Sequence, residues 1–170
     1  MRVIGFAGWS ESGKTTLIEQ LIPRLVAAGQ RVSLIKRAHH GFDIDQPGKD
    51  SYRHREAGAS EVLVTSGQRY ALMHELRGAP ELSLDTAVNL LSPCDLVLVE
   101  GFKTARINKI EVHRSALGKP LLFPGDPAIV ALVSDLPPLS GGRLQEFRPD
   151  SYDAVATYVL QSAQATTFGV

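Results

Sequence analysis

The sequence has very little cysteine and no excess charge of either sign. Cys94 is the only cysteine among 170 residues, so the chain can form neither an intrachain disulfide nor a metal site built on cysteine pairs. Its 18 basic and 18 acidic side chains cancel. This balance excludes the strong basic field that is typical of proteins that bind nucleic acid or anionic lipid.

Long hydrophobic runs are also missing. No apolar stretch reaches the length of a transmembrane helix, and the short run at residues 2–7 fits a strand better than a signal peptide. We therefore expect a cytoplasmic protein with no membrane or nucleic-acid partner. The length predicts one domain over residues 1–165, followed by a frayed tail at 166–170.

What is present is a phosphate-binding motif near the N-terminus. Residues 8–15 read Gly-Trp-Ser-Glu-Ser-Gly-Lys-Thr, the P-loop pattern G-x-x-x-x-G-K-[ST]. Its glycines let the backbone turn N–H groups toward an anion, Lys14 would reach the β- and γ-phosphates, and the Thr15 hydroxyl would sit on Mg²⁺. The apolar run before it fits a parallel strand, and residues 14–28 fit a helix whose positive end faces the phosphates. The predicted nucleotide-binding residues here are Gly8, Ser10, Glu11, Ser12, Gly13, Lys14, Thr15 and Thr16.

A second informative stretch is the run Asp-Leu-Val-Leu-Val at residues 95–99, which is apolar after its first residue and is followed by Glu100. Such a Walker-B-like strand lies beside the P-loop strand and aims its terminal carboxylate at magnesium. We predict that Glu100 joins Thr15 at Mg²⁺ and that Glu100 and Lys14 are the catalytic residues. The alternative is a buried strand that ends in a solvated acid.

The chain becomes polar and rich in turns between residues 37 and 60. Loops of this length are usually functional or disordered, which leaves two interpretations. A nucleotide-responsive loop would use Asp45 or Asp50 to hold Mg²⁺, whereas a solvated loop would use its aspartates as caps. Asp50 is a plausible N-cap for a helix at 51–57. For the adjacent His39 and His40 we favour an anion contact or plain exposure over a metal site.

Two strand-like runs, 61–65 and 69–74, surround a Ser-Gly-Gln turn. Their spacing predicts an antiparallel hairpin added to an otherwise parallel sheet. A two-stranded ribbon is marginal by itself, so we expect it to pack against a second subunit.

Asp135 follows another apolar strand, predicted over 128–135. In guanine-binding P-loop proteins an Asp in this place accepts two hydrogen bonds from the base, and adenine offers neither donor. The usual preceding Asn-Lys or Thr-Lys is absent. We predict that Asp135 reads guanine. Together these elements predict an α/β fold of the P-loop NTPase type, a three-layer sandwich with a mostly parallel sheet.

The chain resembles the molybdopterin-guanine dinucleotide biosynthesis protein B (MobB) family over nearly its whole length. The resemblance rests on the P-loop, the block from His39 to Ser51, Glu56-Ala57-Gly58-Ala59, Leu98 to Lys103, and Val133-Ser134-Asp135. It implies a homodimeric adapter that binds GTP with Mg²⁺ and hydrolyses it slowly. It also implies association with the guanylyltransferase that joins GMP to molybdopterin, and contact with molybdopterin itself.

Two other functions remain open on the same fold. A small-molecule kinase would need arginines over the phosphates, for which Arg53, Arg55 and Arg69 could serve, but no lid insertion is recognisable. A GTP-dependent metal-delivery protein would normally carry a Cys- or His-rich site, and this chain has only His39-His40.

Overall fold

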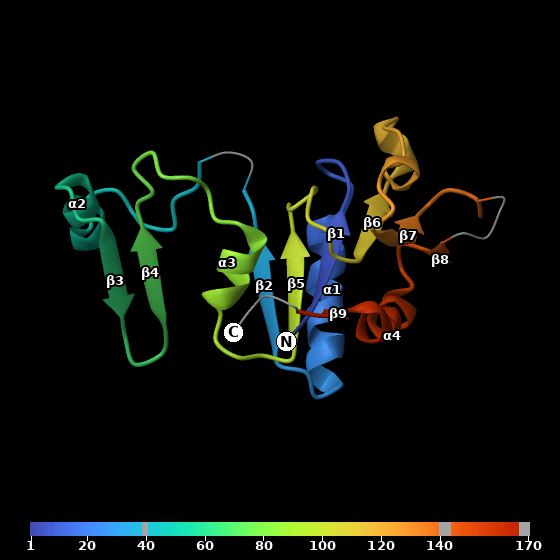
Figure 1. Cartoon of the computed structure of the whole chain (residues 1–170), viewed down its shortest axis with the longest axis horizontal. Coiled ribbons are helices and arrows are strands. Elements are labelled where there is room, and N and C mark those ends of the chain that lie inside the picture. The colour runs from blue at the N-terminus through green and yellow to red at the C-terminus, as the bar shows by residue number, and fades with distance from the viewer. Residues whose placement is uncertain (39–40, 140–143, 167–170) are drawn as a thin grey trace. The chain divides into compact units, whose positions relative to one another are not determined.

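The computed structural model describes residues 1–38, 41–139 and 144–166. The chain forms two compact units (Figure 1). Met1–Arg37 and Leu84–Val170 make up one, which we call the sheet unit, and Ala38–Ser83 make up the other, which we call the hairpin unit. Within the described residues, no helix is long and apolar enough to cross a bilayer.

The sheet unit is built on one large sheet. Its described strands lie in the order β2-β5-β1-β6-β7-β8, with β9 paired to β1. Every neighbouring pair is parallel except β1–β9, so the carboxyl ends of the main strands meet at one edge. Ligands bind at this edge in open α/β sheets. The strands are β1 (Arg2–Ala7), β2 (Val32–Lys36), β5 (Leu96–Glu100), β6 (Lys109–His113), β7 (Ile129–Ser134), β8 (Gln145–Phe147) and β9 (Gln164–Ala165).

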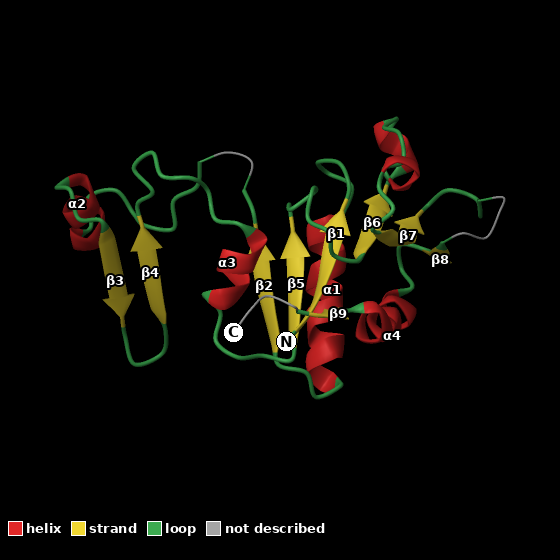
Figure 2. Ribbon diagram, viewed as in Figure 1, coloured by secondary structure: helices red, strands yellow, loops and turns green. Residues whose placement is uncertain are grey.

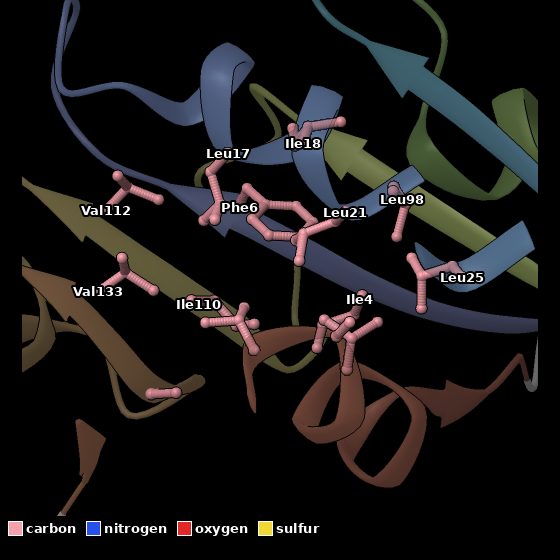
Figure 3. Close-up of a cluster of buried hydrophobic side chains, with 14 of the residues drawn as sticks. Ile4, Phe6, Leu17, Ile18, Leu21, Leu25, Leu98, Ile110, Val112 and Val133 are labelled. Carbon is pink, nitrogen blue, oxygen red and sulfur yellow. The ribbon is translucent and has the colours of Figure 1, made fainter. Parts of the chain in front are cut away.

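Helices cover both faces of this sheet, as the three-layer prediction requires (Figure 2). Because side chains alternate along a strand, Ile4 and Phe6 of β1 face α1 (Lys14–Ala27) and α4 (Tyr152–Ser162). Val3 faces α3 (Leu84–Asn89) on the other side. Figure 3 shows the larger core, in which Phe6 lies among Leu17, Leu21 and Ile110. The predicted P-loop α/β fold is confirmed.

The helix after the P-loop ends close to where the sequence predicted. α1 stops at Ala27, and Gly29 adopts a φ of 80° while its N–H donates to the Val26 carbonyl. A positive φ at this point favours glycine, so Gly29 is a residue type that commonly ends a helix.

The hairpin unit contains α2 (Asp50–Glu56), β3 (Glu61–Thr65) and β4 (Tyr70–His74). The predicted antiparallel hairpin is confirmed, with Thr65 opposite Tyr70, but it forms a separate two-stranded sheet. The prediction that Asp50 is the N-cap of the helix was wrong. Lys49 holds the extended backbone of an N-cap, and Asp50 is the first helical residue.

The C-terminal segment is more ordered than we expected. Residues Gln164–Ala165 pair with β1, and the Thr166 N–H donates to the Met1 carbonyl at 3.0 Å. Thr166, which we placed in the frayed tail, is therefore held to the start of the sheet. Residues 167–170 lie outside the described part of the chain.

Candidate functional site

The P-loop connects β1 to α1 at the carboxyl edge of the sheet, and its glycines are sterically required. Gly8 has a φ of 145° and Gly13 a φ of 97°, both positive. A Cβ on Gly8 would lie 2.4 Å from the Val112 carbonyl oxygen, which no real side chain can do. The loop therefore packs directly against β6, and only glycine lets its backbone come this close.

The Ser12 hydroxyl is the one buried side-chain polar atom, among the described residues, that has no hydrogen-bond partner. Ser12 is only 1% exposed, and leaving such a group unsatisfied costs about 1–3 kcal/mol. An anion held by the loop would provide the missing partner. The orphaned hydroxyl and the glycine-shaped backbone fit a phosphate group.

Lys14 currently folds back onto its own loop. Its Nζ donates to the Gly8 carbonyl at 3.0 Å and to the Trp9 carbonyl at 2.7 Å. Burial lowers the pKa of the Lys14 amine, and the nearby Glu100 carboxylate acts in the opposite direction. The amine therefore lies at the loop, where a bound phosphate could replace the two carbonyls.

The structure brings Glu100 and Thr15 together as the sequence predicted. Glu100 ends β5, which pairs with the P-loop strand, and it is only 8% exposed. The Thr15 hydroxyl lies 3.5 Å from its Oε1, and Lys36 Nζ lies 3.6 Å from its Oε2. Hydroxyl and carboxylate oxygens are ligands that Mg²⁺ prefers, so this pair fits a magnesium ion beside bound phosphates.

Asp135 follows β7 at the same edge of the sheet. Its Oδ1 accepts the Ser115 N–H at 2.8 Å, and this hydrogen bond lowers the pKa of the carboxyl. The carboxylate is therefore charged and held in place two strands away from β1. Its role in reading guanine stays a prediction.

The other predicted loop residues occupy more open positions. Ser10 and Glu11 are exposed, and Glu11 adopts a φ of 64°, which is uncommon for a residue other than glycine. A nucleotide-binding role for Ser10 or Glu11 stays a prediction. Thr16 lies in the first turn of α1, beside a shallow pocket.

Asp45 and Asp50 both belong to the hairpin unit. Asp45 accepts hydrogen bonds from the Ser51 hydroxyl at 2.8 Å and from Arg55 Nε at 3.3 Å, whereas Asp50 is exposed and lies 3.9 Å from Arg53. A magnesium role for either aspartate stays a prediction. His39 and His40 lie outside the described residues.

Arg55, which we considered as a phosphate-binding lid residue, is fully engaged inside the hairpin unit. It pairs with Asp43 at 2.7 Å, Glu75 at 2.7 Å and Asp45 at 3.3 Å. These contacts give it a structural role and weaken the kinase interpretation. In the described part of the chain, no cluster of three metal-binding side chains supports the metal-delivery interpretation.

Two features of the site were not predicted from the sequence. The Trp9 indole Nε1 donates to the Pro120 carbonyl at 2.8 Å, and Lys103 and Lys119 each lie 5.8 Å from its ring centre. This contact fixes one side of the P-loop to the segment after β6. The second feature is Arg114, which lies against Gly13. The only sequence signal for Arg114 was its place directly after a strand.

Comparison with known proteins agrees with this geometry. The family model for molybdopterin guanine dinucleotide synthesis protein B (MobB) matches residues 3–135. The chain belongs to the MobB family. Membership gives it a role in molybdenum cofactor biosynthesis.

Individual relatives match across most of the chain. The molybdopterin-guanine dinucleotide biosynthesis adapter protein of Escherichia coli strain K12 is 46% identical over 138 residues, which cover 79% of each chain. The Haemophilus influenzae adapter protein is 47% identical over 70% of this chain and 67% of its own. The crystal structure of molybdopterin-guanine biosynthesis protein B superimposes with a TM-score of 0.74 at 30% identity, covering 94% of this chain and 98% of that one.

Proposed function

We propose that this protein binds GTP with Mg²⁺ at the P-loop, hydrolyses it slowly, and acts as a cytoplasmic adapter in the attachment of GMP to molybdopterin. One observation supports the proposed binding of GTP and Mg²⁺ at the P-loop. The buried, unpartnered Ser12 hydroxyl lies in the same loop that sets Thr15 beside the nearly buried Glu100. That combination suits phosphates on one side and a divalent cation on the other.

Each residue would then have a simple task. Lys14 would exchange the carbonyls of Gly8 and Trp9 for β- and γ-phosphate oxygens, and the loop N–H groups would hold the same phosphates. Thr15 and Glu100 would hold Mg²⁺, which neutralises charge on the phosphates when bound. Glu100, through its charge and position, is the candidate for orienting the attacking water.

The direct test is calorimetry of GTP·Mg²⁺ binding to wild-type protein and to Lys14→Ala. We expect Lys14→Ala to abolish measurable binding without lowering the unfolding temperature. Arg31→Gln serves as the matched control, because Arg31 pairs with Asp95 at the opposite, amino-terminal edge of the sheet and should leave affinity unchanged. Equal GTP affinity in wild type and Lys14→Ala would overturn the P-loop assignment.

Base choice is tested separately at Asp135. Asp135→Asn should weaken GTP binding by about 1–3 kcal/mol, the cost of leaving buried polar groups mispaired, and should reduce discrimination against ATP. Competition between GTP and ATP on the wild-type protein checks the premise. Equal affinity for the two nucleotides would contradict the guanine assignment.

The adapter role supplies the expected partners. The matched relatives are named adapter proteins of molybdopterin-guanine dinucleotide biosynthesis, which supports a guanylyltransferase, and molybdopterin held by it, as partners here. Affinity capture with the tagged protein, followed by mass spectrometry, should recover that enzyme. Recovery that is the same with Lys14→Ala and without GTP would show that association does not depend on nucleotide.

A homodimer is the assembly that the hairpin unit favours. Leu63, Tyr70 and Leu72 on β3 and β4 are 60%, 70% and 51% exposed, so the ribbon presents apolar side chains that a second copy could cover. Sedimentation should give a dimer for the wild type and a monomer for Leu63→Glu/Leu72→Glu. A wild-type monomer at micromolar concentration would contradict the assembly.

A further inference from the structure

Arg114 lies directly against the P-loop although it is far from it in sequence. It follows β6, the strand that pairs with β1 on the side away from β5. A Cβ on Gly13 would lie 3.5 Å from both Nε and Nη2 of Arg114. The guanidinium therefore lies beside the backbone at the start of α1, close enough that a side chain on Gly13 would touch it.

This guanidinium is available to a ligand. Arg114 is exposed, and no hydrogen bond or ion pair joins its side chain to another residue in the described ranges. Its charge does reach Asp135, whose pKa it helps to lower. A cation beside a phosphate-binding loop, without a partner of its own among these residues, adds to the positive potential at that end of the loop.

The position of Arg114 selects one end of a bound nucleotide. Its neighbours form a shallow pocket whose lining includes Gly13, Thr16, Leu17, Val133 and Tyr152. Lys14 and the loop N–H groups serve the β- and γ-phosphates, whereas the pocket lies over the first turn of α1 between the loop and the β7 edge that carries Asp135. The phosphate nearest to Arg114 is then the one that carries the nucleoside.

We propose that Arg114 is a nucleotide-binding residue that pairs with the α-phosphate. The proposal rests on nucleotide binding at the P-loop and adds a second cation to it. The planar guanidinium can donate two parallel hydrogen bonds to phosphate oxygens, which a lysine cannot do. The site would thus bind a nucleoside diphosphate more tightly than inorganic pyrophosphate, although both contain two phosphates. A nucleoside triphosphate would have the same advantage over inorganic triphosphate.

The test compares ligands that do and do not carry an α-phosphate. GDP and GTP contain it, whereas inorganic pyrophosphate is expected to fill only the β and γ positions. Arg114→Gln should lower the affinity for GDP and for GTP by about tenfold to a hundredfold, the range for loss of a charge-assisted hydrogen bond. The affinity for pyrophosphate should be unchanged. Arg114→Lys should fall between wild type and Arg114→Gln. In ³¹P NMR of bound GDP, the α-phosphate resonance should move in Arg114→Gln and the β-phosphate resonance should not.

Two controls separate this proposal from the function on which it rests. Arg31→Gln removes one positive charge at the opposite edge of the sheet and should leave all three affinities unchanged. Lys14→Ala should weaken all three ligands, pyrophosphate included. Unchanged GDP affinity in Arg114→Gln, or an equal loss for GDP and pyrophosphate, would overturn the α-phosphate role while P-loop binding stands. Absence of GTP binding in the wild type would instead overturn the proposed function.

Discussion

The two units of this chain are stabilised in different ways. In the described residues, every buried apolar side chain lies in the sheet unit, and no residue of the hairpin unit is buried. The hairpin unit relies on ion pairs and hydrogen bonds around Arg55, whose side chain is only 12% exposed, and on Arg77, which donates to the Arg55 and Ala59 carbonyls. A phosphate site needs a rigid support, and the sheet unit provides it.

This difference also bears on assembly. A domain without a core of its own is seldom stable alone, and the hairpin unit exposes apolar side chains on both strands. This difference supports our proposals that the sheet unit binds the nucleotide and that the hairpin unit contacts another chain. Each of the following experiments tests whether the two units differ in this way.

The largest expected effect is on global stability. Leu21 is fully buried beneath the sheet, so Leu21→Ala should lower the free energy of unfolding by about 2–5 kcal/mol through lost contacts and a cavity. Leu63→Ala, at a position 60% exposed in the hairpin unit, should change it by less than about 0.5 kcal/mol when measured at a concentration at which the protein is monomeric. Denaturant unfolding of both variants checks this. Equal losses would show that the hairpin unit carries core packing of its own.

A local effect should follow from the ion pairs. Arg55 holds the pKa of the Asp43 carboxyl below its ordinary value of 3.8, mainly through their hydrogen bond. A carboxyl with a lowered pKa in the folded state stabilises it above the unfolded pKa, and this stability is lost as the pH falls. We therefore expect residues 50–74 to open first as the pH drops below about 4. Amide hydrogen exchange, corrected for intrinsic rates, should detect this as a loss of protection in these residues. Arg55→Gln should open them already at neutral pH.

The sheet unit provides the control for that experiment. Its own exposed pair, in which a hydrogen bond from Arg31 lowers the pKa of Asp95 to about 2, also loses its stabilising effect in acid, but the large core beneath the strands consists of apolar side chains that do not titrate. Protection of β1 and β5 should therefore persist, in wild type and in Arg55→Gln, at the pH at which residues 50–74 become exposed to exchange. Simultaneous opening of both units would mean that they unfold as one.

The smallest expected effect is optical. Trp9 is the only tryptophan, so its fluorescence reports on the P-loop alone. Because its indole is already hydrogen-bonded to the Pro120 carbonyl, GTP·Mg²⁺ should produce a small, saturable change that disappears in Lys14→Ala. A large spectral shift would indicate that the loop leaves this anchor, and that the site is less rigid than the sheet beneath it.

Local sequence patterns predicted where most of the candidate site residues lie. The P-loop glycines, the acid that ends β5 and the acid that follows β7 are all readable, because a strand end fixes where the next residue lies. Arg114 escaped prediction because it lies beside Gly13, a residue that is distant from it in sequence. Asp50 was misassigned because Lys49, with no capping side chain, takes the N-cap backbone.

Nothing in the sequence indicated that the polar residues of β6 are buried. Lys109, Glu111 and His113 alternate with apolar residues, a pattern typical of a strand with one solvated face. The structure buries all three because the segment after β6 covers them. Leu122 and Phe123 donate their N–H groups to Glu111, and His113 contacts the Lys119 carbonyl. Sequence periodicity cannot show that a loop will fold back over a polar face.

Hydrogen exchange on the wild-type protein, with and without GTP·Mg²⁺, tests the division between the units most directly. The account predicts that nucleotide slows exchange at residues 8–17 of the P-loop and α1, and around Arg114 and Asp135, whatever happens in the hairpin unit. Protection confined to residues 41–83, with residues 8–17 unchanged, would contradict it.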